Sequence, residues 1–121
     1  MKTAVSRLKQ SEREFQSAVI YLAKLKGWRV AHFRTSQNAR GDYRTAVAAD
    51  GAGFPDLVLV RDRVIFAELK SETGRLGPAQ VAWLDAIANA VTGDPPPCER
   101  SVVLATVWRP RDWPQIEEAL K

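Results

Sequence analysis

The spacing of apolar residues predicts a helix near the start of the chain, over residues 12–26. The segment SEREFQSAVIYLAKLKG, from position 11, places apolar residues three and four positions apart, as on one face of a helix. Ser11 can cap the first turn, Glu14 follows three residues later as in a capping box, and Gly27 suits the end. The face expected to pack on a core consists of Phe15, Ala18, Val19, Leu22 and Leu25.

Two further helices are predicted toward the end of the sequence. Pro78 fits the first turn of a helix over residues 78–90, and RDWPQIEEALK suits a short helix with Asp112 as its cap. Between them, TGDPPPCER (92–100) is too rich in proline for a helix or a strand, which indicates a connector. The apolar stripe expected on the helix over 78–90 consists of Val81, Leu84 and Ala88.

Four apolar segments have the length and composition of strands. The two central ones are joined by a short turn, RDR, and are apolar on both faces, which is typical of a sheet covered by helices on each side. We therefore expect an α/β fold in one domain, residues 1–121, with a mixed central sheet flanked by helices. The predicted strands are WRVAHFR (28–34), PDLVLV (55–60), VIFAELK (64–70) and SVVLATVW (101–108).

Charged residues lie at the ends of the two central strands, where each apolar run stops. In an antiparallel hairpin, facing residues share one side of the sheet and their numbers sum to a constant. A three-residue turn at 61–63 gives a sum of 124, so that Asp56 faces Glu68. Lys70 then lies on the same side, about 6 to 7 Å from Glu68 along the strand. A two-residue turn would place Asp56 on the opposite face.

In the first register two carboxylates meet at one end of the hairpin. Like charges about 4 Å apart repel by about 4 kcal/mol at an effective dielectric constant of about 20, and a divalent cation turns this repulsion into attraction. Mg²⁺ prefers carboxylate and water oxygens, and Mn²⁺ binds similar ligands. Lys70 could then position a water or stabilise charge on a phosphate. The simpler alternative is a Pro-Asp turn and a solvated Glu-x-Lys pair.

Composition limits the kinds of site and partner that the chain can have. The 121 residues include one cysteine, Cys98, and one histidine, His32, so an internal disulfide and a Cys/His zinc site are excluded. The net charge of +4 favours an anionic partner such as nucleic acid. No apolar run reaches the roughly 20 residues of a membrane helix, and the N-terminal residues lack a signal-peptide core, so we expect a cytoplasmic protein with no membrane partner.

Four arginines are candidates for contact with a nucleic-acid backbone on grounds of charge. Residues 35–53, rich in glycine and polar side chains, are expected to form a long loop. Arg34, Arg40 and Arg44 belong to this region, and Arg75 lies in the loop after Lys70. An ordinary solvated loop is the alternative interpretation for the first three.

The motifs PD at 55–56 and ELK at 68–70 resemble the PD-(D/E)xK nuclease signature. Their surroundings, SEREFQSAVIYLAKLKGW, GFPDLVLV and FAELKSETGRLGPAQVAWL, resemble the virus-type replication-repair nuclease (VRR-NUC) domain over nearly the whole chain. The resemblance implies a restriction-endonuclease-like core. It also implies that Asp56, Glu68 and the Leu69 carbonyl bind the metal, that Lys70 serves the attacking water, and that Gln80 lies near the site. Glu14 matches an acidic residue that points toward the metal, although its capping role competes.

Such domains are metal-dependent DNA nucleases, so the resemblance implies an endonuclease that hydrolyses phosphodiester bonds with Mg²⁺ or Mn²⁺. Small phage-type members are similar to Holliday-junction resolvases and tend to be homodimers, which implies a bacterial or phage-infected cell and branched DNA or a four-way junction as substrate. A homodimeric junction resolvase is therefore one alternative, since symmetric cutting needs two related sites. A nucleic-acid-binding module without catalysis is another. No residue excludes RNA as a substrate.

Overall fold

The predicted mixed sheet is confirmed by the computed structural model, which describes residues 11–33, 36–37, 43–44, 48–91 and 103–121. Four strands lie in the order β1-β4-β5-β6. The first three are antiparallel neighbours, and β6 pairs with β5 in parallel, because the chain crosses over through a helix between them. The strands are β1 (Arg29–His32), β4 (Leu57–Val60), β5 (Val64–Leu69) and β6 (Val103–Trp108).

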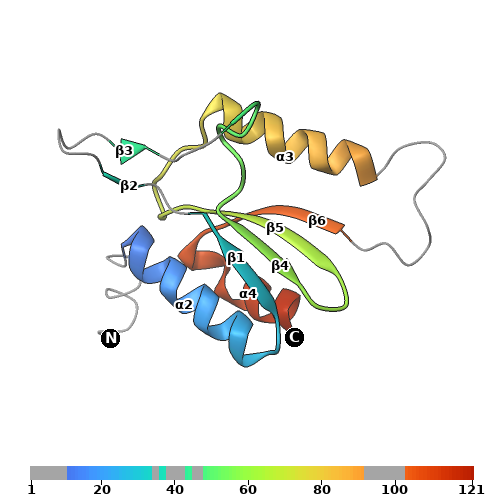
Figure 1. The fold of residues 1–121 in the computed structure, drawn as a ribbon. Coiled ribbons are helices and arrows are strands. Elements are labelled where there is room, and N and C mark those ends of the chain that lie inside the picture. The colour runs from blue at the N-terminus through green and yellow to red at the C-terminus, as the bar shows by residue number, and fades with distance from the viewer. Residues whose placement is uncertain (1–10, 34–35, 38–42, 45–47, 92–102) are drawn as a thin grey trace.

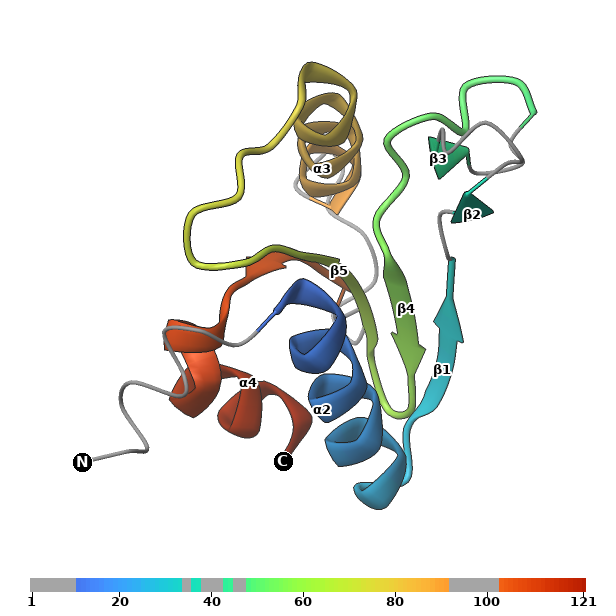
Figure 2. The same cartoon turned by 90° about the vertical axis from the view of Figure 1, so that its left-hand side faces the viewer.

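Helices cover both faces of this sheet, as the two-sided apolar strands predicted. Figures 1 and 2 show α2 (Glu12–Leu25) and α4 (Trp113–Leu120) on one face and α3 (Pro78–Val91) on the other. A 3-10 turn, η1 (Pro110–Asp112), leads from β6 into α4. None of the helices among the described residues combines the length and the apolar character that a membrane crossing requires.

The core lies between the sheet and the pair α2 and α4. The indole N–H of Trp28 donates to the Leu120 carbonyl at 3.0 Å, which joins the start of β1 to the end of α4. Leu25, predicted to be buried, is 68% exposed, because Ala23 is the last residue of α2 to enter the core. The buried apolar side chains are Phe15, Val19, Ala23, Trp28, Leu57, Leu59, Ile65, Ala67, Leu69, Trp108, Ile116 and Leu120.

The helix α3 packs less deeply than its sequence predicted. It has no buried residue, and Val81 of the expected stripe is 40% exposed. Its contacts are mainly with β6 and with an aromatic side chain, Phe54, that reaches Trp83. Apolar periodicity therefore located this helix correctly without indicating how closely it approaches the sheet.

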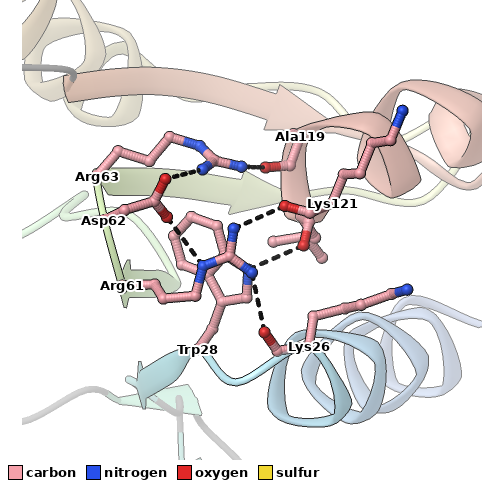
Figure 3. Close-up of polar contacts among 8 residues, drawn as sticks. Lys26, Trp28, Arg61, Asp62, Arg63, Ala119 and Lys121 are labelled. Atoms are coloured by element: carbon pink, nitrogen blue, oxygen red, sulfur yellow. Dashed lines mark hydrogen bonds and ion pairs between the residues drawn. The ribbon is translucent and has the colours of Figure 1, made fainter.

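The hairpin between β4 and β5 has the predicted three-residue turn. Val60 pairs with Val64 and Leu57 with Ala67, so paired residue numbers sum to 124. The two arginines of the turn hold it in place through hydrogen bonds to other segments, as Figure 3 shows. Arg61 donates to the Lys26 carbonyl at 2.9 Å, and Arg63 donates to the Ala119 carbonyl.

Both guanidinium groups also lie 4.7 Å from the centre of the Trp28 ring, and Asp62 bridges them at 2.8 and 2.7 Å. Cations at the last carbonyls of helices complement the helix dipole. The cluster of Trp28, Arg61, Asp62 and Arg63 therefore ties the closed end of the hairpin to α2 and α4.

Other local predictions need correction. Asp112 does not cap α4 through its side chain; its Oδ2 instead accepts from the Arg109 backbone N–H at 2.9 Å. Residues 35–53, expected to form a loop, contain a small antiparallel sheet of β2 (Ser36–Gln37) and β3 (Tyr43–Arg44). The connector at 92–100, with Cys98, lies outside the described residues.

Candidate metal and nuclease site

Asp56 and Glu68 lie at the open end of the β4–β5 hairpin, opposite the arginine turn. Continuing the observed register by one pair places them level with each other, because both pairs of numbers sum to 124. Asp56 Oδ2 accepts a hydrogen bond from the Leu69 backbone N–H at 3.0 Å, which fixes the carboxylate over the end of β5. The two acidic side chains are thus held on one side of the sheet.

Glu68 is the buried charged residue of the site, with only 2% of its surface exposed. Burial, a hydrogen bond with the Asp56 side chain and the negative charge of Asp56 together raise the pKa of Glu68 from 4.5 to about 8, while Lys70 opposes the rise. Burial and the neighbouring acid thus disfavour the charged form of Glu68, and Lys70 offsets them only in part.

Gln80 approaches Glu68 from the first turn of α3. Its amide N–H donates to Glu68 Oε1 at 3.0 Å, and its oxygen accepts from the Gly77 backbone N–H at 2.8 Å. Gly53 holds this end of α3 in place: its φ is +82°, and a Cβ added there would lie 2.5 Å from the backbone of Ala79. A glycine is required for this close approach, so the loop before β4 helps to position Gln80.

Lys70 follows Leu69 at the end of β5. Its backbone N–H donates to the Trp108 carbonyl at 3.0 Å, which anchors it to the end of β6. Its ammonium group is close enough to Glu68 and Glu12 to lower the pKa of both carboxyl groups. The site therefore contains one cation facing several acids.

Glu12 is the residue of α2 that takes part in this electrostatic group. Burial raises the pKa of Glu12, Lys70 lowers it, and the charge of Asp56 raises it further. Glu14, named from the sequence, is exposed, and its backbone N–H is bonded to Ser11 Oγ at 3.1 Å. Figure 2 shows the start of α2 beside the end of β5, and the structure brings Glu12 rather than Glu14 to the acidic pair.

A helical signal could have identified Glu12. It lies three residues before Phe15, the first buried residue of α2, and so shares the face that meets the sheet. Glu14 is turned away by about 100° from Phe15. Glu14 was predicted from the family resemblance, with a capping role as the competing interpretation, and the cap bond from its backbone N–H to Ser11 Oγ is present.

A comparison with protein-family models matches residues 11–94 to the VRR-NUC domain. The chain belongs to the VRR-NUC family. The match includes α2, the hairpin with Asp56 and Glu68, and α3, whereas β6, η1 and α4 follow it. Neither the comparison with curated proteins nor that with solved structures gave a match. Membership makes the chain a nuclease-family domain whose substrate class is DNA.

The remaining residues named from the sequence lie around this VRR-NUC site or outside the described part. The Leu69 side chain is fully buried in the core, and its backbone lies beside Asp56. Arg75 is exposed in the loop after Lys70. Arg44 belongs to β3, of which only the backbone is described, and Arg34 and Arg40 lie outside the described residues.

The donor set of this VRR-NUC domain suits a small, hard cation. Across the described ranges, no group of three or more His, Cys, Asp or Glu side chains is gathered closely enough to hold a metal ion by itself. Two carboxylates, Asp56 and Glu68, do converge, and Mg²⁺ commonly uses one or two protein carboxylates and retains several waters. The residues therefore fit Mg²⁺ or Mn²⁺ better than a metal that needs a closed cage of side chains.

Proposed function

We propose that this VRR-NUC domain is an endonuclease that hydrolyses phosphodiester bonds in DNA with Mg²⁺ or Mn²⁺. The observation that carries the proposal is Glu68, a fully buried acid beside Asp56 whose pKa is raised to about 8. If the role of Glu68 were only structural, an apolar residue would give a more favourable free energy of folding, because burying a carboxylate is unfavourable unless it is paired. Both acids are better explained as ligands of an ion.

Asp56 and Glu68 would hold this cation, with the Leu69 carbonyl as a further oxygen ligand. When bound, the ion supplies Lewis-acid stabilisation of the negative charge that develops on the phosphate. Glu12 adds a third carboxylate at the edge of the site, which is coupled electrostatically to Lys70 and Asp56. Because no three acids among the described residues gather closely enough to hold an ion, we expect Glu12 to contact a water bound to the ion rather than the ion itself.

Lys70 has the role of orienting the attacking water and stabilising the charge on the phosphoryl oxygens. Its ammonium group faces Glu68 and Glu12, so it can donate hydrogen bonds toward a substrate oxygen in the same space. Gln80 keeps the Glu68 carboxyl group in one orientation through its 3.0 Å hydrogen bond. Arg75, exposed on the following loop, would contact the DNA backbone and contribute to a steep salt dependence of binding.

The test is incubation of supercoiled plasmid, linear duplex and four-way junction DNA with the protein, with Mn²⁺ or with chelator. We expect cleavage that requires the ion and is lost in Glu68→Gln, which keeps the size of the side chain. Glu117→Gln, an exposed acid on α4, is the matched control and should cleave as the wild type does. Binding of DNA without cleavage under every condition would instead show a nucleic-acid-binding module.

The same assay separates a general endonuclease from a homodimeric junction resolvase. Paired symmetric cuts in the four-way junction, together with a dimer in sedimentation at micromolar concentration, would favour the resolvase, because two sites related by a two-fold axis are needed. A monomer that cuts branched and linear DNA alike would favour the general enzyme.

A further inference from the structure

Phe33 directly continues the strand that neighbours Asp56. The last pair between β1 and β4 is His32 with Leu57, and the Phe33 backbone N–H donates to the Asp56 carbonyl at 2.9 Å. Phe33 is therefore the cross-strand neighbour of Asp56. Facing residues of an antiparallel pair lie on the same side of the sheet, with Cβ atoms about 5 Å apart. An aromatic ring thus adjoins the carboxylate pair.

The ring is held from behind by other aromatic side chains. Phe33 meets Phe54 edge to face, with ring centres 5.4 Å apart and planes at 87°. Phe54 in turn contacts Phe66 at 6.1 Å and Trp83 at 5.0 Å. Trp83 is anchored through its indole N–H, which donates to the Asp50 carbonyl at 2.8 Å.

The rings of this cluster belong to residues that are close to the site residues in the sequence or in the sheet. Phe66 lies two residues before Glu68 on β5, so the two share a face of the sheet, and the contact of Phe54 with Phe66 places Phe54 on that face too. Trp83 lies one helical turn after Gln80. The aromatic cluster of Phe33, Phe54, Phe66 and Trp83 therefore forms one wall beside the acidic pair.

Phe33 is the member of this cluster that is open to solvent, at 47% exposed. Among the side chains that the structure describes, the other exposed aromatic ring is Tyr21, on α2, at 70%. Tyr21 takes part in none of the ring contacts found within the described ranges. A large apolar ring that is both exposed and rigidly supported is suited to binding, because little conformational freedom is lost when a ligand covers it.

We propose that Phe33 stacks on an unpaired nucleobase of the DNA strand whose phosphate lies at Asp56 and Glu68. The inference rests on the proposed function, which places that phosphate. Every base has an apolar face that stacks on aromatic side chains, but inside a duplex both faces are already covered by neighbouring bases. The ligand is therefore a base in a single strand, a junction or a frayed end. The site would then bind single-stranded segments more tightly than intact duplex.

The test measures stacking without cleavage. A single-stranded oligonucleotide containing the fluorescent base 2-aminopurine is titrated with the protein in the presence of chelator, and an intact duplex of the same length is titrated in parallel. We expect quenching by the wild type, and about a 5- to 150-fold weaker affinity of Phe33→Ala for the single strand, from the usual contribution of one stacked base. The affinity for duplex should not change.

Conservative variants distinguish stacking from a structural role. Phe33→Tyr and Phe33→Trp keep a flat ring and should retain quenching, whereas Phe33→Leu keeps apolar bulk and should lose it. Tyr21→Ala, which removes the other exposed ring, should bind and quench as the wild type does. The melting temperature of each variant shows whether it is folded. If Phe33→Ala is unfolded, the comparison of Phe33→Leu with the wild type tests stacking in its place.

Three results would overturn the inference. Phe33→Leu could quench and bind as the wild type does, or all Phe33 variants could weaken duplex and single strand equally. Alternatively, the variants could dissociate a dimer in sedimentation without a single-strand effect, which would make the ring a protein interface. Each of these can occur while the wild type still cleaves DNA with Mn²⁺, so failure of stacking is separable from failure of the proposed nuclease activity.

Discussion

Gln80 and Glu68 are joined by a hydrogen bond of 3.0 Å that connects α3 to the sheet. The amide oxygen of Gln80 is occupied by the Gly77 N–H at 2.8 Å, so the amide is fixed with its N–H toward the acid. A neutral donor therefore faces the buried carboxyl group. Gln80 adds no positive charge that would compete with a bound ion for the Glu68 carboxyl group, as a lysine at the same place would.

Replacing Gln80 with glutamate should make the fold depend on divalent cation. Gln80→Glu puts a further carboxylate, in addition to that of Asp56, about 3 Å from Glu68, and like charges in a buried site repel strongly. We expect a lower melting temperature in chelator, and a larger rise on addition of Mn²⁺ than in the wild type. Thermal unfolding with and without Mn²⁺ measures both effects.

The matched control for that variant is Gln115→Glu, at an exposed position of α4. It adds the same charge far from the acidic pair, so its melting temperature should respond to Mn²⁺ as the wild type's does. Equal responses in Gln80→Glu and Gln115→Glu would contradict an ion site at Glu68.

The metal-free protein should lose stability as pH rises from about 4.5 to 8 because of Glu68. Its pKa is raised to about 8 in the folded state, so the neutral form is favoured by folding. This contribution is fully present below pH 4.5 and is lost as pH rises through about 8.

Urea unfolding in chelator at several pH values measures this slope, and Glu68→Gln should remove it. Other carboxyl groups titrate in both proteins, so the difference between the wild type and Glu68→Gln isolates the one group. Because an ion requires the charged form, Mn²⁺ binding near pH 7 should release protons. Identical pH profiles for the two proteins would show that Glu68 is not held neutral.

Lys70→Ala should separate binding from chemistry. The variant keeps the backbone bond from residue 70 to Trp108, so the sheet should remain intact. Loss of a group that positions a water and stabilises phosphoryl charge typically lowers turnover about 10²- to 10⁴-fold. DNA affinity should fall little, with the salt slope reduced by about one. Single-turnover cleavage and binding titrations test this, and cleavage at the wild-type rate would remove Lys70 from the mechanism.

The hairpin register could be predicted from the sequence because it depends on parity. A turn of three residues and a turn of two place Asp56 on opposite faces, so the number of residues in the turn decides whether Asp56 meets Glu68. The family resemblance, in contrast, pointed to Glu14, because the angle at which α2 crosses the end of β5 cannot be read from the sequence. Glu12 becomes recognisable only through its proximity to Lys70 and Asp56.

Contacts between segments far apart in the sequence were beyond prediction. The aromatic cluster depends on how α3 lies over the sheet, and the stripe expected on that helix was wrong because Val81 remains exposed. Arg109 gave no signal at all: it follows β6 as one of several arginines near the end of the sequence. Its hydrogen-bond partners are backbone carbonyl groups, which every residue has, so no pattern of side chains in the sequence predicts these bonds.

Arg109 fixes the loop that follows Lys70. Its Nη1 donates to the carbonyls of Ser71 and Gly74, each at 2.6 Å, and Gly74 also bonds to Ser71 Oγ at 3.0 Å. Residues 71–74 lead from Lys70 to Arg75 and then to Gln80. Arg109 lies outside the segment 11–94 that matches the family. We expect Arg109, in the C-terminal part of the fold, to position Lys70 through this loop.

Arg109→Ala should lower turnover as well as stability. The loss of charge-assisted hydrogen bonds to two partly buried carbonyls should cost about 1.5 to 3 kcal/mol of unfolding free energy. Released from this contact, the loop would hold Lys70 less accurately, and we expect kcat to fall about tenfold or more, since small misplacements of positioned groups are costly. The KM for DNA should change less.

Arg63→Ala is the matched control, because Arg63 also donates to a carbonyl, that of Ala119, at the closed end of the hairpin. It should destabilise the protein while leaving kcat unchanged, and an equal fall of kcat in both variants would assign the effect to general loss of stability.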